Sequence, residues 1–250
     1  MNKKLVSIIT PTYNCAKFIG RTIESVQAQT YTNWEMIIVD DRSTDNTKQI
    51  ISEYKKNDSR IKYYLLEKNS GAAMARTKSM KLAQGSYMAF LDSDDIWMPD
   101  KLEKQIKWME ETGHAFTCTA YEQIDEDDNL LGKTIKTITK TDYNRLLLDC
   151  PVGNSTVMYN VEKMGKFEVP NIRKRNDDAL WLTMLKKEKY IWGMPDVLMK
   201  YRIRKNSISS DKCKVIKYHW ILYRDIEHLS IPRSLFHIVF WCIIKVLRIK

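Results

Sequence analysis

The first 110 or so residues alternate short apolar runs with segments of helical periodicity, and this alternation limits the fold more than any other feature. The apolar runs are rich in β-branched residues and cover residues 5–10, 35–39, 61–66 and 87–91. Parallel strands buried on both faces have such continuous apolar sequences, and helices connect them. We therefore expect an α/β protein with a Rossmann-like, doubly wound, mostly parallel sheet.

Polar residues follow three of these predicted strands at the point where each strand ends. Pro11-Thr12-Tyr13 follows the first strand, Asp40-Asp41 the second and Asp92-Ser93-Asp94 the fourth. The carboxyl ends of parallel strands lie at one edge of a sheet, and open α/β sheets bind their ligands beyond that edge. The three clusters are therefore expected to converge on one ligand site.

The fourth strand is followed by three carboxylates that lie close together in the sequence, Asp92, Asp94 and Asp95. Neighbouring carboxylates repel one another, and each deprotonated oxygen needs a partner. A divalent cation that also binds substrate phosphates would supply the missing positive charge. The alternative is a polar turn that caps the following helix, where Asp is common. The residues alone leave both interpretations open.

The glycines do not form a familiar phosphate-binding loop. G-x-G-x-x-G is absent, and Gly132-Lys133-Thr134 has Asp127 where a P-loop needs its first glycine. A nucleotidyltransferase, which also combines a doubly wound sheet with metal-bound carboxylates, usually carries a glycine-rich basic loop after the first strand. Pro11-Thr12-Tyr13-Asn14 is not such a loop, so this class is disfavoured.

The second half of the chain is less regular. Residues 115–121 and 156–159 are predicted strands, and residues 125–129 form a solvated hairpin turn. Residues 176–185 are predicted as a helix with Asp177 and Asp178 in its first turn. The helix dipole stabilises carboxylates at that position, so helix capping is the structural alternative to a catalytic role for Asp177.

Positive charge is concentrated at the C-terminus. The net charge is +10, and from residue 200 to residue 250 there are 12 Lys and Arg against 3 Asp and Glu, which leaves +9. A basic tail on a nearly neutral body suits an anionic surface, either a membrane or a nucleic acid. Nucleic-acid binding has no other support in the sequence, and we do not expect it.

The final segment, residues 235–249, has an unbroken apolar centre at residues 238–244. Arg233, Lys245, Arg248 and Lys250 flank it. The segment is shorter than the roughly 20 residues needed to cross a bilayer. It suits an interfacial helix lying on an anionic leaflet. A helix packed on the body and a homodimer contact are the alternatives.

Cysteine usage and the N-terminus indicate the compartment. The five cysteines are scattered, without a C-x-x-C pair, as expected for reduced thiols. Thr10-Pro11 ends the first apolar run far short of a signal-peptide core. We therefore expect a cytoplasmic protein, peripheral on the inner face of the plasma membrane.

Four ordered motifs carry a family resemblance. They are Val6-Ser7-Ile8-Ile9-Thr10-Pro11-Thr12-Tyr13-Asn14, Ile38-Val39-Asp40-Asp41-Arg42-Ser43-Thr44-Asp45, Asn69-Ser70-Gly71-Ala72-Ala73-Met74-Ala75-Arg76 and Phe90-Leu91-Asp92-Ser93-Asp94-Asp95. Over residues 5 to about 205 the chain resembles the family 2 glycosyltransferases, whose catalytic domain has the GT-A fold. Asn176 to Leu182 and Tyr201-Arg202 look most like bacterial enzymes of teichuronic acid, capsule or lipopolysaccharide assembly.

The resemblance implies a role for each matching residue. Tyr13 would stack on the nucleotide base, Asp41 would accept the uracil N3–H, and Asp40 would shape that pocket. Asp92 would contact the ribose or the metal, Asp94 would bind Mn²⁺ or Mg²⁺, and Asp177 would be the catalytic base. The full set of implied nucleotide-binding residues is Pro11, Thr12, Tyr13, Asp40, Asp41, Arg76, Asp92 and Ser93. Asp95 would cap the helix after Pro99.

Two residues depart from the family pattern, and one assignment depends on register. Asn176 stands where the family usually has Glu, which would remove a neighbour that tunes the base, and Thr77 stands where Asn is common. Choosing Asp177 over Asp178 as the base rests on the register of Ala179-Leu180-Trp181.

The implied function is metal-dependent, inverting transfer of a sugar from a UDP-sugar to an acceptor hydroxyl. The acceptor would be a lipid-linked saccharide in cell-envelope polysaccharide synthesis. Residues 1–205 would form the catalytic domain, divided into a nucleotide-binding half (1–110) and an acceptor-binding half (111–205). Residues 206–250 would be the basic amphipathic helical tail. A non-catalytic, membrane-associated sugar-nucleotide-binding protein is the alternative.

Overall fold

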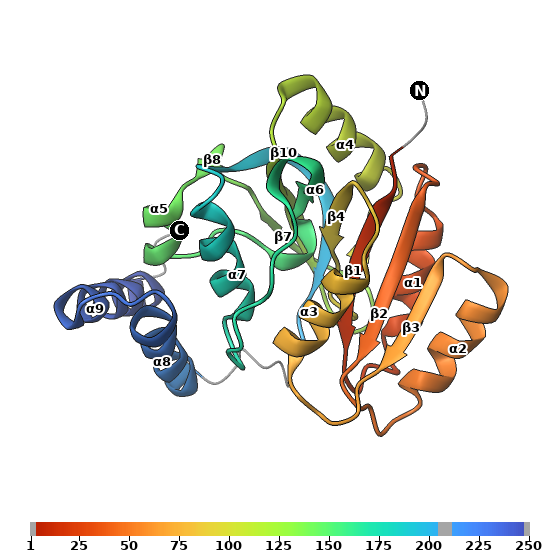
Figure 1. The fold of residues 1–250 in the computed structure, drawn as a ribbon, viewed down its shortest axis with the longest axis horizontal. Helices are drawn as coiled ribbons and strands as arrows, with labels where there is room; N and C mark the ends of the chain where they lie inside the picture. The colour runs from red at the N-terminus through yellow and green to blue at the C-terminus, as the bar shows by residue number, and fades with distance from the viewer. Residues whose placement is uncertain (1–3, 205–211, 248–250) are drawn as a thin grey trace.

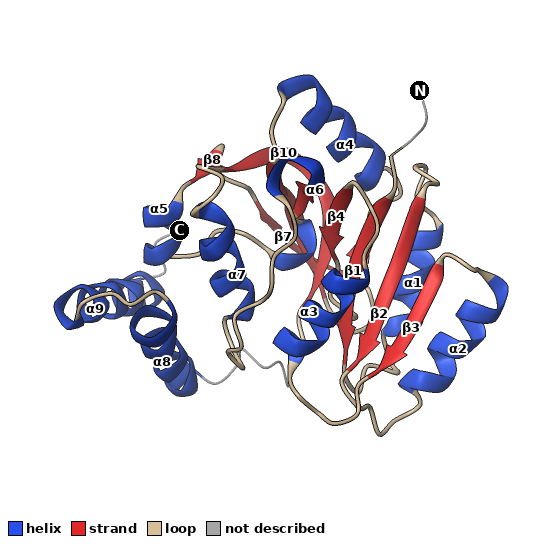
Figure 2. Ribbon diagram, viewed as in Figure 1, coloured by secondary structure: helices blue, strands red, loops and turns tan. Residues whose placement is uncertain are grey.

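The computed structural model describes residues 4–204 and 212–247, which form a ten-stranded sheet with helices on both faces (Figures 1 and 2). The strand order is β3-β2-β1-β4-β9-β6-β10-β5, with β7 paired to β6 and β8 paired to β10. The strands are β1 (Val6–Thr12), β2 (Trp34–Asp40), β3 (Ile61–Leu65), β4 (Tyr87–Phe90), β5 (Ile96–Trp97), β6 (Phe116–Ile124), β7 (Leu130–Ile135), β8 (Lys140–Thr141), β9 (Met158–Asn160) and β10 (Ile191–Arg202). The helices are α1 (Ile19–Gln27), α2 (Thr47–Asn57), α3 (Ala72–Leu82), α4 (Lys101–Thr112), α5 (Tyr143–Leu148), η1 (Asn154–Thr156), α6 (Val161–Met164), α7 (Asn176–Leu185), α8 (Lys212–Ile221), η2 (Leu222–Ile226) and α9 (Ile231–Leu247).

Six of the strands share one direction. β3, β2, β1 and β4 pair in parallel. β9 is antiparallel to both β4 and β6, so β6 runs in the direction of β4, and β10 is parallel to β6. The short strands β5, β7 and β8 are antiparallel to their partners. The predicted mostly parallel sheet is therefore confirmed.

The sheet separates two hydrophobic cores, and strand β1 shows how. Val6 and Ile8 lie in the core formed with α1, α2 and α4, whereas Ile9 lies in the core formed with α3 and α7. Side chains alternate between the two faces along a strand, so a strand covered on both faces needs apolar residues at consecutive positions. The continuous apolar runs in the sequence have this physical cause.

In the second half of the chain, three of the predicted elements lie where the sequence placed them and one is shorter than predicted. The Asp125 N–H donates to the Asn129 carbonyl oxygen and closes the β6–β7 hairpin at the predicted turn. Helix α7 has the predicted bounds, and β6 lies at the predicted strand. The strand predicted at 156–159 starts later, at Met158, because the residues before it form the short 3₁₀ turn η1.

Helices α8 and α9 lie together at the end of the molecule opposite β3 (Figure 1). The inner side of α9 is buried through Ser234, His237 and Trp241. Its outer side exposes Ile231, Leu235, Phe236, Val239 and Ile243, each at least 47% accessible. The predicted helix is therefore present and packs on the body with one side only. Arg248 and Lys250 lie outside the described residues, and nothing is described of the Lys245 side chain. No helix in the described ranges has the length and apolarity required to span a bilayer.

Candidate active site

The carboxyl ends of β1, β2, β4 and β10 lie at one edge of the sheet because these strands share a direction. This edge brings together Thr12 at the end of β1, Asp40 at the end of β2 and the loop that begins at Asp92 after β4. It also receives Arg202 from the end of β10. The three polar clusters predicted to converge are thus on one edge, together with an arginine to which the sequence assigned no role.

The two adjacent carboxylates after β2 hold the local backbone. Asp40 is fully buried, and its oxygens accept hydrogen bonds from the backbone and hydroxyl of Ser43 and from the Tyr63 hydroxyl. Asp41 accepts from the backbone N–H groups of Ser70 and Gly71, at 2.6 and 2.8 Å. Each Asp41 oxygen has a second lone pair for a ligand. Asp41 therefore fixes the loop that starts α3 to this edge of the sheet.

The end of β1 combines a buried hydroxyl with an exposed aromatic ring. Pro11 is buried, and the Thr12 hydroxyl has no hydrogen-bond partner within the described part of the chain. Tyr13 is 50% exposed. An unpaired buried hydroxyl is unfavourable in the absence of a ligand, and an exposed ring is free to stack. Both features suit a bound nucleoside.

Arg76, on α3, connects the end of β4 with the start of α7. Its Nη2 donates to Asp92 Oδ1 at 3.0 Å, and its Nη1 donates to the side-chain oxygen of Asn176. Asn154 Nδ2 donates to the same Asp92 oxygen at 2.8 Å. The Arg76 side chain is buried, so its charge is held between the two halves of the site. Asn176, despite replacing the usual glutamate, still accepts a hydrogen bond from this arginine.

Asp94 and Ser93 form the turn beyond Asp92. Asp94 Oδ2 accepts from Arg204 Nη1 at 3.0 Å, and its backbone carbonyl oxygen accepts from Arg202 Nε at 2.7 Å. The Ser93 carbonyl oxygen accepts from the Cys15 thiol and the Thr22 hydroxyl. The turn is therefore held from β10 on one side and from the start of α1 on the other.

The sequence predicted that Asp95 caps the helix after Pro99, and this prediction is wrong. The Asp95 oxygens accept from the Ser155 hydroxyl at 2.6 Å and from the Arg202 backbone N–H at 3.0 Å, and the residue is 1% exposed. Burial raises its pKa well above the ordinary range, and the neighbouring carboxylates add to the rise. Helix α4 instead begins after Asp100, whose side chain makes no capping hydrogen bond. Asp95 thus ties η1 and β10 to the carboxylate turn.

Asp177 and Asp178, adjacent in sequence, have different environments. Asp178 is buried and pairs with Arg175 at 2.6 Å. Burial raises its pKa to about 6, and Arg175 opposes the rise. Asp177 is half-buried and forms no hydrogen bond or ion pair with the residues at 4–204 and 212–247. It lies near enough to Asp92 to contribute to a raised pKa of that group, although burial is the larger cause. Asp177 therefore lies within electrostatic reach of Asp92, whereas Asp178 is buried against Arg175.

The Asp178–Arg175 pair predicts a large loss of stability in Asp178→Asn. The substitution leaves Arg175 largely buried without its counter-charge, which costs about 3 kcal/mol for a pair of this kind. A chain of this size then loses about 6–12 °C in melting temperature. Calorimetry of the variant measures this change, and an unaltered melting temperature would show that the pair does not stabilise the fold.

Asp92 and Asp94 offer incomplete coordination to a metal ion. Asp92 Oδ2 and Asp94 Oδ1 accept no hydrogen bond within the described residues, so each is available to a cation. The same residues contain no group of three or more His, Cys, Asp or Glu arranged to hold a metal. Mg²⁺ and Mn²⁺ sites often use one or two carboxylates and complete their shell with substrate phosphates and water. The pair therefore fits a cation that arrives with a diphosphate.

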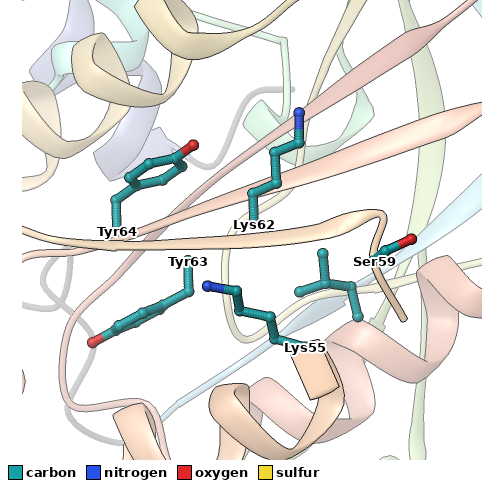
Figure 3. Close-up of a pocket in the computed structure, with 6 residues that line it drawn as sticks. Lys55, Ser59, Lys62, Tyr63 and Tyr64 are labelled. Atoms are coloured by element: carbon teal, nitrogen blue, oxygen red, sulfur yellow. The ribbon is translucent and has the colours of Figure 1, made fainter. Parts of the chain in front are cut away.

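A separate pocket of about 340 Å³ lies along the outermost strand β3. Lys55, Ser59, Ile61, Lys62, Tyr63 and Tyr64 line it. Figure 3 shows Tyr63 and Lys55 on one side of the β3 ribbon and Tyr64 and Lys62 on the other. Its residues begin before β3 and run along the strand, whereas the carboxylates follow the strand ends. This pocket therefore lies beside β3 and outside the carboxylate turn, although it shares Tyr63, whose hydroxyl donates to Asp40.

Four residues at this site were not predicted from the sequence: Asn154, Ser155, Arg202 and Arg204. Tyr201-Arg202 lay within the family resemblance but suggested no role. Placing Arg202 at the site requires knowing that β10 runs parallel to β4, although the two strands are separated in the sheet by β9 and β6. The short η1 turn, which carries Asn154, has no hydrophobic periodicity that could have revealed it.

Comparisons with known proteins identify the family of this chain. Residues 7–171 match the model of the family described as Glycosyl transferase family 2. The chain is 46% identical over 243 residues to TuaG of Bacillus subtilis, named for teichuronic acid biosynthesis, covering 97% of this chain and 94% of TuaG. It is 39% identical over 234 residues to WfgD of Escherichia coli, covering 93% and 90%. WfgD is named a UDP-Glc:α-D-GlcNAc-diphosphoundecaprenol β-1,3-glucosyltransferase.

A solved structure supports the same fold. The Staphylococcus aureus protein TarS, residues 1–349 in complex with UDP-GlcNAc, superposes with a TM-score of 0.71 and 19% identity. The match covers 96% of this chain and 72% of the TarS chain. This likeness confirms the expected GT-A fold, and the family match together with the two relatives confirms the expected enzyme class. The chain belongs to glycosyl transferase family 2.

Proposed function

We propose that this glycosyltransferase moves a sugar from a UDP-sugar to the hydroxyl of a lipid-linked saccharide, with inversion and with a divalent metal. The observation that carries the proposal is the meeting of three carboxylates at one sheet edge. Asp92 and Asp94 each have an oxygen available to a cation, and Asp177 has no partner among the described residues. Two carboxylates for a metal and one for a proton are sufficient for single-displacement transfer.

The nucleoside end of the donor is assigned to the ends of β1 and β2. Tyr13 stacks on the base, Pro11 and Thr12 line it, and Asp41 accepts the uracil N3–H. Asp40 keeps the pocket in shape through its three hydrogen bonds. Two features support this assignment: the exposure of Tyr13 and the unpaired hydroxyl of Thr12.

The diphosphate end is assigned to the turn after β4. Asp94 and Asp92 hold the Mn²⁺ or Mg²⁺, which when bound offsets the negative charge that develops on the departing diphosphate. Ser93, in the same turn, is assigned to contact the nucleotide through its backbone. Arg76 neutralises Asp92 from the protein side and keeps its second oxygen directed to the ligand.

Asp177 takes the proton from the acceptor hydroxyl. The acceptor oxygen then attacks the anomeric carbon as the bond from that carbon to the diphosphate oxygen breaks, and UDP leaves. A single displacement inverts the anomeric configuration. General base catalysis of this kind contributes about 10²–10⁴-fold to the rate.

The relatives support the donor and the acceptor classes. WfgD is named for UDP-Glc and a diphosphoundecaprenol-linked sugar, TuaG for teichuronic acid biosynthesis, and TarS was solved with UDP-GlcNAc. A uridine diphosphate donor and a lipid-linked saccharide acceptor in cell-envelope polysaccharide synthesis, including capsule assembly, are the substrates we assign to this chain.

Selectivity among nucleotides tests the donor assignment. We expect UDP to bind in the presence of Mn²⁺ at least about tenfold more tightly than CDP, since a cytosine ring has no N3–H for Asp41 to accept, and one hydrogen bond to a charged group is worth about 1.5–3 kcal/mol. Isothermal calorimetry with UDP, CDP and GDP measures the difference. Equal affinities for UDP and CDP would contradict the assignment of a uridine donor.

The outer side of α9 is assigned to an anionic membrane surface at the inner face of the plasma membrane. Ile231, Leu235, Phe236, Val239 and Ile243 recur at helical spacing and are exposed. The basic composition of residues 200–250 supplies attraction to anionic lipid. We accordingly assign residues 1–205 to the catalytic domain and residues 206–250 to membrane attachment.

Vesicle co-sedimentation tests the membrane surface. The double variant Leu235→Ser, Phe236→Ser should bind phosphatidylglycerol vesicles about tenfold or more weakly, because two apolar side chains no longer enter the interface. The matched control is Leu130→Ser, Leu131→Ser, which changes two similarly exposed side chains on β7. Equal binding by the two double variants would contradict the assignment.

A further inference from the structure

The carboxylate assigned to the metal already has a positive partner. Arg204 Nη1 donates to Asp94 Oδ2 at 3.0 Å, so the positive charge lies beside the carboxylate whose Oδ1 is available to a cation. The two side chains are 31% and 23% exposed, so water reaches the pair. Partly exposed ion pairs of this kind contribute little to stability, so breaking this one costs little.

Arg202, two residues earlier at the end of β10, is held much more firmly. The Arg202 side chain is fully buried, and its guanidinium donates to the backbone oxygens of Asp94 and Asp125 and pairs with Asp128 at 2.5 Å. If the Arg202 guanidinium moved away, the two backbone oxygens and the Asp128 carboxylate, all partly buried, would lose this partner. Arg204 has Asp94 as its side-chain hydrogen-bond partner among the described residues. Only Arg204 can therefore leave its partner without disrupting the turn.

An aromatic ring keeps Arg204 near the site when it changes partner. The guanidinium carbon of Arg204 lies 5.0 Å from the centre of the Phe18 ring, and that of Arg202 lies 4.9 Å from it. Phe18 is buried at the start of α1 and is not free to follow a moving side chain. A cation within about 6 Å of an aromatic ring is attracted to it. Arg204 can thus release Asp94 and remain at the carboxyl edge.

We propose that Arg204 is an exchangeable counter-ion: it neutralises Asp94 in the free enzyme and donates to the diphosphate once a divalent cation occupies Asp94. This proposal rests on the nucleoside diphosphate donor assigned above. A divalent cation beside Asp94 repels the guanidinium, whereas the diphosphate oxygens that come with the cation attract it. Arg204 is therefore a donor-binding residue, and it competes with the metal when no nucleotide is bound.

The two halves of the proposal predict changes of opposite sign in Arg204→Gln. Mn²⁺ without nucleotide should bind about threefold or more tightly, because a competing positive charge is gone. UDP in saturating Mg²⁺ should bind about tenfold or more weakly, because a charge-assisted hydrogen bond to phosphate is lost. Electron paramagnetic resonance of free Mn²⁺ measures the first affinity, and calorimetry measures the second. Arg204→Lys should recover most of the UDP affinity.

Lys17→Gln is the matched control. Lys17 lies 5.2 Å from the same Phe18 ring and pairs with Glu126, so the variant removes one positive charge nearby without touching Asp94. Both of its affinities should stay within about twofold of wild type. Weaker Mn²⁺ binding by Arg204→Gln would overturn the counter-ion role, and unchanged UDP binding would overturn the diphosphate role. If wild type itself binds no UDP with Mg²⁺, the donor assignment fails, while the Mn²⁺ titration still decides the counter-ion role.

Discussion

Asp177→Asn is expected to abolish sugar transfer while leaving UDP binding nearly intact. The amide has the size of the carboxylate but cannot take a proton from the acceptor hydroxyl, so turnover should fall by about 10²–10⁴-fold. Because Asp177 makes no hydrogen bond or ion pair with described residues, the substitution breaks no contact that holds the fold. Turnover under saturating donor and calorimetric UDP affinity are the two measurements.

The adjacent carboxylate makes this result specific. Asp178→Asn should lower the melting temperature, for the reason given above, but should retain turnover in the molecules that remain folded at low temperature. Asp177→Asn should show the reverse, with an unchanged melting temperature and no turnover. Wild-type turnover in Asp177→Asn would rule out Asp177 as the base, and loss of turnover in folded Asp178→Asn alone would move that role to Asp178.

Asp94→Ala is expected to remove the metal dependence of UDP binding. Wild type should bind UDP more tightly as Mn²⁺ is added, and the variant should bind it equally weakly with and without Mn²⁺. The loss in the presence of metal should be about 100-fold or more, since even groups that only orient metal ligands commonly contribute 10–100-fold to metal affinity. Calorimetric titration of UDP at several Mn²⁺ concentrations gives both affinities.

A surface carboxylate provides the control for Asp94. Asp127, exposed in the β6–β7 turn, has the same charge, and its side chain makes no hydrogen bond within the described residues. Asp127→Ala should keep the full metal dependence. If Asp94→Ala also keeps it, the cation is not held at the turn after β4, and the assignment of Asp94 and Asp92 as metal ligands is wrong.

The parallel half of the fold was predictable because each of its strands is covered on both faces. Val6, Ile8 and Ile9 must all be apolar when neighbouring positions face different cores, and the resulting runs are visible without a structure. The polar residues that end those runs then identify one edge of the sheet. The same reasoning does not extend to β9 and β10, where short strands and register shifts interrupt the pattern.

The candidate site was predictable where its residues follow a strand and not where they depend on long-range packing. Asp92 and Asp94 can be recognised in the sequence because two carboxylates lie so close together directly after a strand. Asp95 belongs to the same cluster, yet its role depends on Ser155 and Arg202, which are 60 and 107 positions away along the chain. The sequence therefore suggested a local helix cap, and the long-range contacts made that prediction wrong.

The sequence separated Asp177 from Asp178 only through the register of the family resemblance. Both lie in the first turn of α7, where the helix dipole favours either carboxylate. The burial of Asp178 against Arg175 separates them, and that contact depends on how α7 is packed. Helical periodicity alone could not reveal which of the two faces the sheet edge.

Metal-dependent transfer from a UDP-sugar produces free UDP, which can be measured. The purified full chain is incubated with a panel of UDP-sugars, with and without Mn²⁺, in the presence of a diphosphoundecaprenol-linked saccharide, and the UDP formed is quantified. We expect UDP release from at least one donor, and we expect both the removal of Mn²⁺ and the substitution Asp177→Asn to abolish it. Binding of UDP without any UDP formed from a donor would contradict sugar transfer and favour a non-catalytic sugar-nucleotide-binding protein.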